Sequence, residues 1–158
     1  MFCYQCEQTA GGKGCTVRGV CGKEPDVASL IDLLLYATKG LSMYAHRLRG
    51  LGIKDHEIDI FVIEALFTAV TNVNFDPERY YPLLMKASEL KDKAKNMYED
   101  TCKKSGKTPE KLTGPAEWTP ESDLEGLIKQ GESVTILKRK ESLGDDVTGL
   151  QELIVYGL

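Results

Sequence analysis

The sequence predicts an all-α protein whose helices follow an N-terminal cysteine-rich loop. Four of its five cysteines lie within the first 21 residues, among glycines and with little hydrophobic periodicity. From residue 26 onward, apolar residues recur at steps of three and four, which is the spacing of helices that bury one face. We therefore expect a loop over residues 1–25, a first helical bundle over 26–104, and a linker with helices of a second bundle over 105–158.

The first helix is predicted to begin at Pro25 and Asp26, because the Asp26 carboxylate can accept hydrogen bonds from the free N–H groups of the first turn. Gly50 and Gly52 predict its end, since glycine readily takes the left-handed conformation that closes a helix. Its apolar face comprises Val27, Leu30, Ile31, Leu34, Thr38, Leu41, Ala45 and Leu48.

Two more helices are predicted before residue 105. The second covers about residues 55–71. The third starts at Asp76, Pro77 and Glu78, which supply an N-cap, a proline at the first position and an acid in the first turn. Three helices joined by short turns can pack as a bundle. The apolar faces are Ile58, Phe61, Val62, Ala65, Leu66, Ala69 and Val70 of the second helix, and Tyr80, Leu83, Leu84, Ala87, Leu90, Ala94, Met97 and Tyr98 of the third.

The last third of the chain is predicted to contain shorter elements. Residues 105–119 are polar, with glycine and proline breaks, and indicate a connection. A short helix is expected to open at Thr119-Pro120-Glu121 and to end near residue 131. Residues 134–137 fit a brief strand or an extended segment, because periodicity cannot decide over four residues. A final helix is expected over 145–156, and since no cap follows it before Leu158, we expect the chain to be part of a longer protein.

Composition and charge exclude several classes of protein. The formal net charge is −4 and no basic face stands out, which argues against a nucleic-acid partner. The basic run Lys138–Lys140 is flanked by Glu132 and Glu141 and is expected to be solvated surface. No apolar stretch approaches the ~20 residues that span a bilayer, and no signal peptide opens the chain. We therefore expect a cytoplasmic protein with no membrane partner, in which disulfides are disfavoured and thiols stay available as ligands.

The spacing of the cysteines is the most specific motif. Cys3, Cys6, Cys15 and Cys21 form the pattern C-x2-C-x8-C-x5-C. Thiolates select zinc, copper(I) or iron–sulfur clusters over hard cations, and the neighbouring glycines can wrap closely and leave N–H groups free for sulfur. Structural zinc usually takes two C-x2-C pairs. The irregular spacing therefore favours a four-cysteine iron–sulfur cluster, with zinc and unligated thiols as the alternatives.

Other chemistry-bearing residues carry weaker signals. Cys102 is expected to be a small buried residue near the end of the third helix. His46 and His56 are expected at the surface rather than as ligands. Asp59 and Glu64 lie on different sides of their helix, so they do not form a paired-carboxylate site. No serine-histidine-aspartate arrangement, P-loop or dinucleotide fingerprint is present.

The residues also carry a family resemblance. The opening MFCYQCEQTA, with the cysteine spacing above, resembles the N-terminus of the hybrid-cluster proteins, also called prismane proteins. The similarity continues at Asp32–Leu34 and Gly40–Ser42, in the segment TNVNFD at Thr71–Asp76, at Gly149-Leu150 and at Tyr156–Leu158. It covers essentially this whole chain but only the first part of the family's chain, which is several times longer.

This resemblance implies a specific role. Family members are cytoplasmic redox enzymes that reduce hydroxylamine to ammonia and water and are linked to nitric oxide and nitrosative stress. Cys3, Cys6, Cys15 and Cys21 match the ligands of an N-terminal cubane, and the short spacing matches the [4Fe-4S] form typical of strict anaerobes. The N-terminal domain of the family is two three-helix bundles.

The substrate's own site is implied to lie elsewhere. In the family a hybrid [4Fe-2O-2S] cluster, held by downstream domains, reacts with the substrate, and its ligands are absent from this chain. We expect this segment to have no catalytic residue. Its partners are a redox electron donor, the downstream domains and a small molecule related to hydroxylamine or nitric oxide.

Two other functions stay open from the residues themselves. One is a stand-alone iron–sulfur electron-transfer module, and the other is a zinc-stabilised helical interaction domain. The cations Lys13, Arg18 and Lys23 near the cysteines either raise the potential of a cluster or serve docking and solubility.

Overall fold

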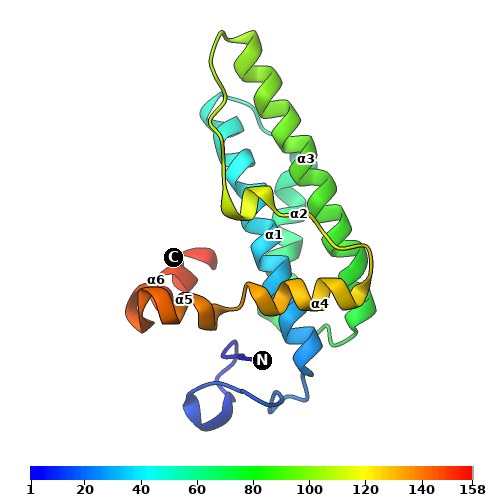
Figure 1. Ribbon diagram of the computed structural model, residues 1–158, viewed down its shortest axis with the longest axis vertical. Coiled ribbons are helices and arrows are strands. Elements are labelled where there is room, and N and C mark those ends of the chain that lie inside the picture. The colour runs from blue at the N-terminus through cyan, green and yellow to red at the C-terminus, as the bar shows by residue number, and fades with distance from the viewer. Residues whose placement is uncertain (158) are drawn as a thin grey trace.

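A computed structural model describes residues 1–157 (Figure 1). Within these residues the only strand-like pairing is an isolated bridge between Cys3 and Cys15, so the prediction of an all-α fold is confirmed. Leu158, the end of the last segment that resembles the hybrid-cluster proteins, lies outside the described residues. The helices are α1 (Pro25–Gly50), α2 (His56–Thr71), α3 (Tyr80–Lys104), α4 (Leu124–Ser133), α5 (Ile136–Leu143) and α6 (Asp145–Val155), and the 3-10 turns are η1 (Ala10–Gly12), η2 (Pro77–Arg79) and η3 (Gly114–Glu117).

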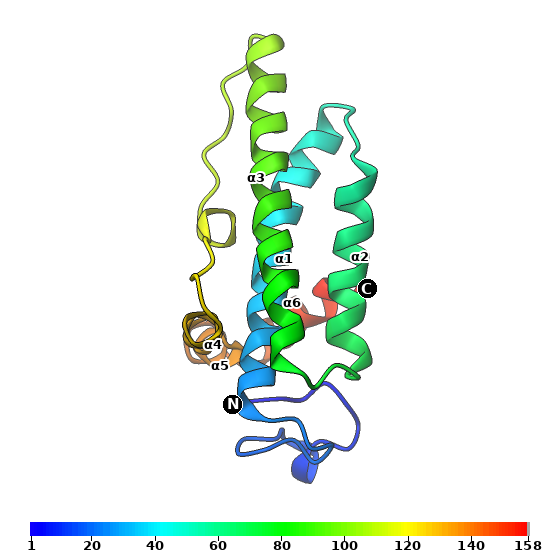
Figure 2. The ribbon, with the colours of Figure 1, turned by 90° about the vertical axis from the view of Figure 1, so that its right-hand side faces the viewer.

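Helix α1 is the element on which the rest of the bundle packs. It lies between α2 and α3 (Figure 2) and also contacts α4 and η3. Fourteen of its 26 residues are buried, which is more than one helix face can hold. The fully buried side chains of the core include Leu30, Leu33, Leu34 and Leu41 of α1, Ala65 and Ala69 of α2, Tyr80, Leu84, Leu90 and Ala94 of α3, and Leu127 of α4.

The three long helices lie close to where the sequence predicts them. The Asp55 side chain caps α2 by accepting a hydrogen bond from the Ile58 N–H at 3.1 Å. The Asp76 side chain accepts from the Glu78 N–H at 3.0 Å, but the turn that it caps is η2, and α3 begins only at Tyr80. The apolar face predicted for α2 includes one residue too many, because Val70 is 51% exposed rather than buried.

Two predictions for the C-terminal third are wrong. Helix α4 begins at Leu124 rather than at residues 119–121, because the Asp123 side chain caps it by accepting from the Gly126 N–H at 2.7 Å. Residues 134–137 form neither a strand nor an extended segment throughout, since Ile136 starts the additional helix α5. In the described residues no neighbouring strand offers the ladder of hydrogen bonds that a strand here would need. Helix α6 begins at Asp145 as expected, directly after Gly144, which has φ 81°.

Two glycines allow other segments to approach α1 closely. Helix α4 crosses α1 (Figure 1), and a Cβ added at Gly131 of α4 would lie 2.2 Å from the Ser29 carbonyl oxygen. A Cβ added at Gly40 of α1 would lie 2.1 Å from the Pro115 carbonyl oxygen. Backbone atoms cannot move aside as a flexible side chain can, so both positions require glycine for the observed packing.

The long connection after α3 is tied down by polar contacts. The Lys91 ammonium, only 2% exposed, donates to the Trp118 carbonyl at 2.5 Å. The Trp118 indole donates to Gln130 Oε1 at 3.1 Å, which joins the connection to α4. Trp118 itself is buried, as expected of a core residue.

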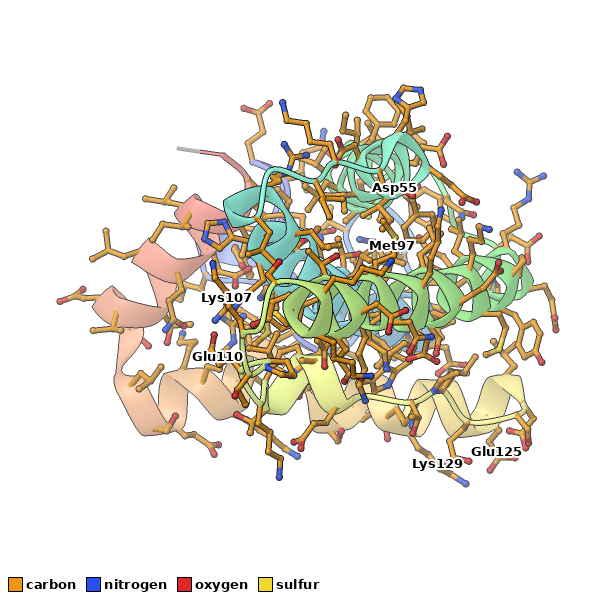
Figure 3. The ribbon with its side chains drawn as sticks, turned by 90° about the horizontal axis from the view of Figure 1, so that it is seen from above. Asp55, Met97, Lys107, Glu110, Glu125 and Lys129 are labelled. Carbon is orange, nitrogen blue, oxygen red and sulfur yellow. The ribbon has the colours of Figure 1, made fainter. Side chains whose placement is uncertain are left out.

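Several ion pairs lie on the outer surface of the helices. In Figure 3, Glu125 and Lys129 lie on the outer side of α4, with Lys129 Nζ 2.6 Å from Glu125 Oε1. Asp55, also labelled there, pairs with Lys93 at 2.8 Å. Exposed pairs contribute ~0–1 kcal/mol each, so the fold depends mainly on the apolar contacts of α1. Among residues 1–157 we find no helix with the length and apolarity to cross a membrane.

The contact between α4 and α1 leads to a stability prediction. We expect Gly131→Ala to lower the free energy of unfolding by about 1–3 kcal/mol, because the new methyl group overpacks a helix crossing. Gly149→Ala is the matched control: Gly149 is also helical, but an added Cβ there meets no atom within 4 Å. Alanine should stabilise that position by up to ~1 kcal/mol. Urea denaturation measures both, and equal effects at the two glycines would contradict the crossing geometry.

Candidate metal centre

The cysteine loop lies at one end of the helices, below the start of α1 (Figures 1 and 2). Its two ends are held together by the backbone: the Cys3 N–H donates to the Cys15 carbonyl at 3.0 Å, and the Cys15 N–H donates back at 2.7 Å. Cys15 is buried, whereas Cys21 is exposed and Cys3 and Cys6 are partly buried. All four thiols are free, so no disulfide competes for them.

Glycine is required at two points of the loop. Gly14 has φ 124° and lies against the Phe2 ring, where an added Cβ would come within 2.4 Å of the nearest ring atom. At Gly19 an added Cβ would lie 2.9 Å from Lys23 Cβ and 3.1 Å from Cys21 Sγ. The expectation that glycines let this loop wrap closely is confirmed at these positions, and Gly19 lies directly beside a candidate ligand.

Hydrogen-bond donors surround three of the four sulfurs. The Ala10 N–H donates to Cys15 Sγ at 3.4 Å. Backbone hydrogen bonds from Val20 and Ala10 lower the pKa of the Cys15 thiol, against the opposing effect of burial. Burial also opposes ionisation of Cys21, yet the side-chain hydrogen bond from Asn72 and backbone N–H groups leave the pKa of that thiol lowered. The thiolate, the form that binds metal, is therefore favoured at both positions.

Asn72 connects the TNVNFD segment to this loop. It closes α2 in the left-handed conformation, with φ 51°, which asparagine tolerates better than most residues. Its side-chain Nδ2 lies 3.5 Å from Cys21 Sγ, although the two residues are 51 positions apart. Sequence reasoning singled out the segment only through the resemblance and missed this contact. An asparagine directly after a predicted helix end was the available signal.

The three cations of the loop, Lys13, Arg18 and Lys23, differ in burial and in the groups they contact. Lys23 is 1% exposed, and its ammonium lies 3.8 Å from Cys3 Sγ and 2.8 Å from Gln5 Oε1. Arg18 instead pairs with Glu24 at 2.6 Å on the surface, and Lys13 is exposed. Lys23 is therefore the cation placed to act on a group held by the cysteines.

A cavity of about 400 Å³ lies beside Cys3, between the loop, α1, α5 and α6. Glu152 of α6 accepts from the Tyr4 hydroxyl at 2.6 Å and from the Arg139 guanidinium at 2.5 Å. Asp32 of α1 also lines it, and burial, with the Glu152 charge as a second cause, raises the pKa of Asp32 to about 7. Sequence reasoning missed this cluster, although a lone acid within the apolar run at residues 30–35 was a signal.

The basic run of α5 is therefore not simply solvated surface. Arg139 reaches the buried Glu152, and the Lys140 ammonium lies 5.2 Å from the centre of the Phe2 ring. Arg139 thus joins α5 to α6, and Lys140 joins α5 to the start of the loop. The expectation failed because a charge run shows only composition, while α5 turns one of its cations inward.

The weaker candidates lie where expected. His46 and His56 are exposed, and Cys102 is 2% exposed in α3, away from the loop. Asp59 pairs with Arg49, while Glu64 is exposed. None of these side chains approaches the cysteine loop, so they leave the loop as the candidate site.

Comparison with known proteins identifies the family. A family model described as the prismane/CO dehydrogenase family matches residues 1–158. The chain belongs to the prismane/CO dehydrogenase family. A protein named hydroxylamine reductase from Rhodospirillum rubrum is 51% identical over 158 residues, and one of the same name from Geobacter sulfurreducens is 49% identical over 160 residues. Each match covers the whole chain but 29% of the relative's length, so this chain spans less than a third of these relatives.

Iron–sulfur cofactors follow from membership of the prismane family, and the donor set fits them. Four reduced thiols are soft ligands, and N–H groups directed at sulfur are the outer shell that an anionic cluster uses. Within residues 1–157, however, no three side chains of cysteine, histidine, aspartate or glutamate lie close enough together to hold a metal ion. The loop thus carries the donors without gathering them at one point.

The Asn72 contact predicts a change in thiol chemistry. In the metal-free chain we expect Asn72→Asp to raise the pKa of the Cys21 thiol by about one unit, because a carboxylate replaces a hydrogen-bond donor to the thiolate. The alkylation rate of the Cys21 peptide as a function of pH, followed by mass spectrometry, measures it. Asn96→Asp on the exposed face of α3 is the control. An unchanged Cys21 profile in Asn72→Asp would contradict the contact.

Proposed function

We propose that this chain is the N-terminal electron-relay part of a hydroxylamine-reducing enzyme. A [4Fe-4S] cluster would be held by Cys3, Cys6, Cys15 and Cys21. The single observation that carries the proposal is the loop itself, with four free thiols and N–H donors to three of their sulfurs, in a chain matched along its whole length by the prismane family. The named activity belongs to relatives that are more than three times longer.

The reaction takes two electrons and two protons: hydroxylamine gains them, its N–O bond breaks, and ammonia and water leave. When bound, the [4Fe-4S] cluster supplies a one-electron carrier. In our proposal the electron donor is a redox protein in the cytoplasm, and the substrate, hydroxylamine or a small molecule related to nitric oxide, binds in downstream domains rather than here.

The chain's own residues would set the properties of this relay. The Lys23 ammonium, buried beside Cys3, opposes the added negative charge of the reduced state and so favours reduction. The Ala10 N–H and the Asn72 amide act in the same direction on Cys15 and Cys21. Gly19 keeps the space beside Cys21 Sγ free of a Cβ.

Exposed apolar side chains support a longer protein. Helix α6 and the outer side of α2 expose large apolar residues, which single soluble domains rarely gather. We propose that downstream domains cover them. On α6 and in and directly after α2, the most exposed are Ile63 and Phe67 of α2, Val73 after it, and Leu150 and Ile154 of α6.

Metal analysis tests the cofactor. After anaerobic reconstitution with iron and sulfide, we expect about four irons and four sulfides per chain and a broad absorption near ~400 nm. Cys6→Ser and Cys15→Ser should lose most of the bound iron, because each removes one of four ligands. Cys102→Ser, the matched control in α3, should keep it. Binding of one zinc without sulfide would contradict the proposal and favour a zinc-stabilised domain.

A second prediction concerns Lys23. We expect Lys23→Met, which keeps a long apolar stem but removes the charge, to lower the reduction potential by about 60 mV, a tenfold change in the equilibrium constant of a one-electron couple. Lys13→Met in the same loop is exposed and should change the potential much less, since water screens its charge. Spectroelectrochemical titration measures both. Equal shifts for the two lysines would rule out a specific role for Lys23.

A further inference from the structure

The cavity beside Cys3 holds an acid with no partner. Asp32 of α1 is partly exposed and lines this cavity, and among the described residues no hydrogen bond or ion pair within 4.0 Å joins its carboxyl group to another group. A carboxyl group that is partly removed from water usually has such a partner. Glu152, the other acid of the cavity, is by contrast held by Tyr4 and Arg139.

Charged groups face Asp32 from each element packed around it. Lys23 comes from the loop, Lys39 from α1 itself, Arg139 from α5 and Glu152 from α6. The three cations favour the ionised carboxyl group and Glu152 disfavours it. Lys39 and Arg139 are also about one-third exposed, so the cavity has a polar route to solvent.

Lys23 links this acid to the cysteine loop. Its buried ammonium contacts Cys3 Sγ at 3.8 Å and is one of the cations acting electrostatically on Asp32. Cys3 and Asp32 line the same cavity. A charge added at the cysteine site therefore acts on Asp32 across this shared cavity, where the protein screens it less than bulk water would.

We propose that Asp32 binds one proton when the cysteine site accepts one electron, so that electron relay through this chain is coupled to proton uptake. This inference rests on the proposed function. The electron comes from a one-electron donor protein, and the proton comes from solvent water by way of the cavity. Charge is balanced, since one electron and one proton enter together, and the reverse step releases both.

The electrostatics of the cavity support this coupling. Burial and then Glu152 raise the pKa of Asp32 to about 7, which brings its protonation into the neutral range. A further negative charge at the cysteine site raises that pKa again. By thermodynamic reciprocity, proton binding at Asp32 must favour reduction to the same extent. The potential should thus fall as the pH rises from about 7 toward the higher pKa of the reduced state.

Redox titration of the cluster-loaded chain tests the coupling. In the wild type we expect the potential to fall by up to about 59 mV per pH unit, the value for one proton per electron, between about pH 7 and about pH 9. Asp32→Asn, which is permanently neutral, should lose most of this slope. Asp32→Glu should keep a slope, because it can still titrate. Asp26→Asn makes the same chemical change at an exposed position of α1 and should behave as the wild type.

Infrared difference spectra give a readout that does not depend on potential. Reduction should add the carbonyl band of a protonated carboxyl group in the wild type and in Asp26→Asn but not in Asp32→Asn. Equal slopes in all four proteins, or a band that persists in Asp32→Asn, would overturn the proposal. Failure to bind iron and sulfide would overturn the proposed function as well, whereas a bound cluster with a pH-independent potential would overturn only the role of Asp32.

Discussion

Burial of α1 on several sides is the constraint on which the remaining structure depends. Its apolar residues contact α2, α3, α4 and η3, so no other element has to pack extensively with more than one neighbour. The same helix begins four residues after Cys21 and thereby places the cysteine loop at a fixed end of the bundle. Asp32 lies on it about two turns from that end. The core and the candidate site are thus organised by one helix.

The loop itself has almost no apolar anchor and is positioned by polar contacts. Tyr4 reaches Glu152 of α6, Lys23 reaches Gln5 and Cys3, and Asn72 of α2 reaches Cys21. Hydrogen bonds of this kind contribute about 1 kcal/mol each and leave much of the loop's conformational entropy unopposed. Bonds to a bound metal group add far more stability, because ligand binding and ordering of the loop then occur together.

Sequence patterns were sufficient to predict helices that are determined by residues close together in the sequence. The three-and-four spacing of apolar residues located α1, α2 and α3 within a few positions. A helix that buries one face places an apolar residue on that face in every turn, so the pattern repeats along the sequence. Helix α5 was missed since its eight residues provide only two turns, and Ile136 is its one buried residue. The four cysteines were singled out as ligands by their spacing, and that assignment stays a prediction. The sequence did not reveal what Lys23, Asn72 and Asp32 contact, because the tertiary fold alone brings each of them near its partner.

Asp32 violates the rule that acids stay out of helix faces that pack on a core, and such violations concentrate where function outweighs stability. A partly buried, unpaired carboxyl group destabilises the fold when it is ionised, because the raised pKa means that folding favours its protonated form. Stability from this group is therefore full below its ordinary pKa and declines as the pH rises through about 7. A leucine at this position would remove that cost, yet the cavity surrounds the acid with three cations that hold its pKa near neutrality instead of higher. A charge balance of this kind keeps a proton exchangeable, which a purely structural role does not require.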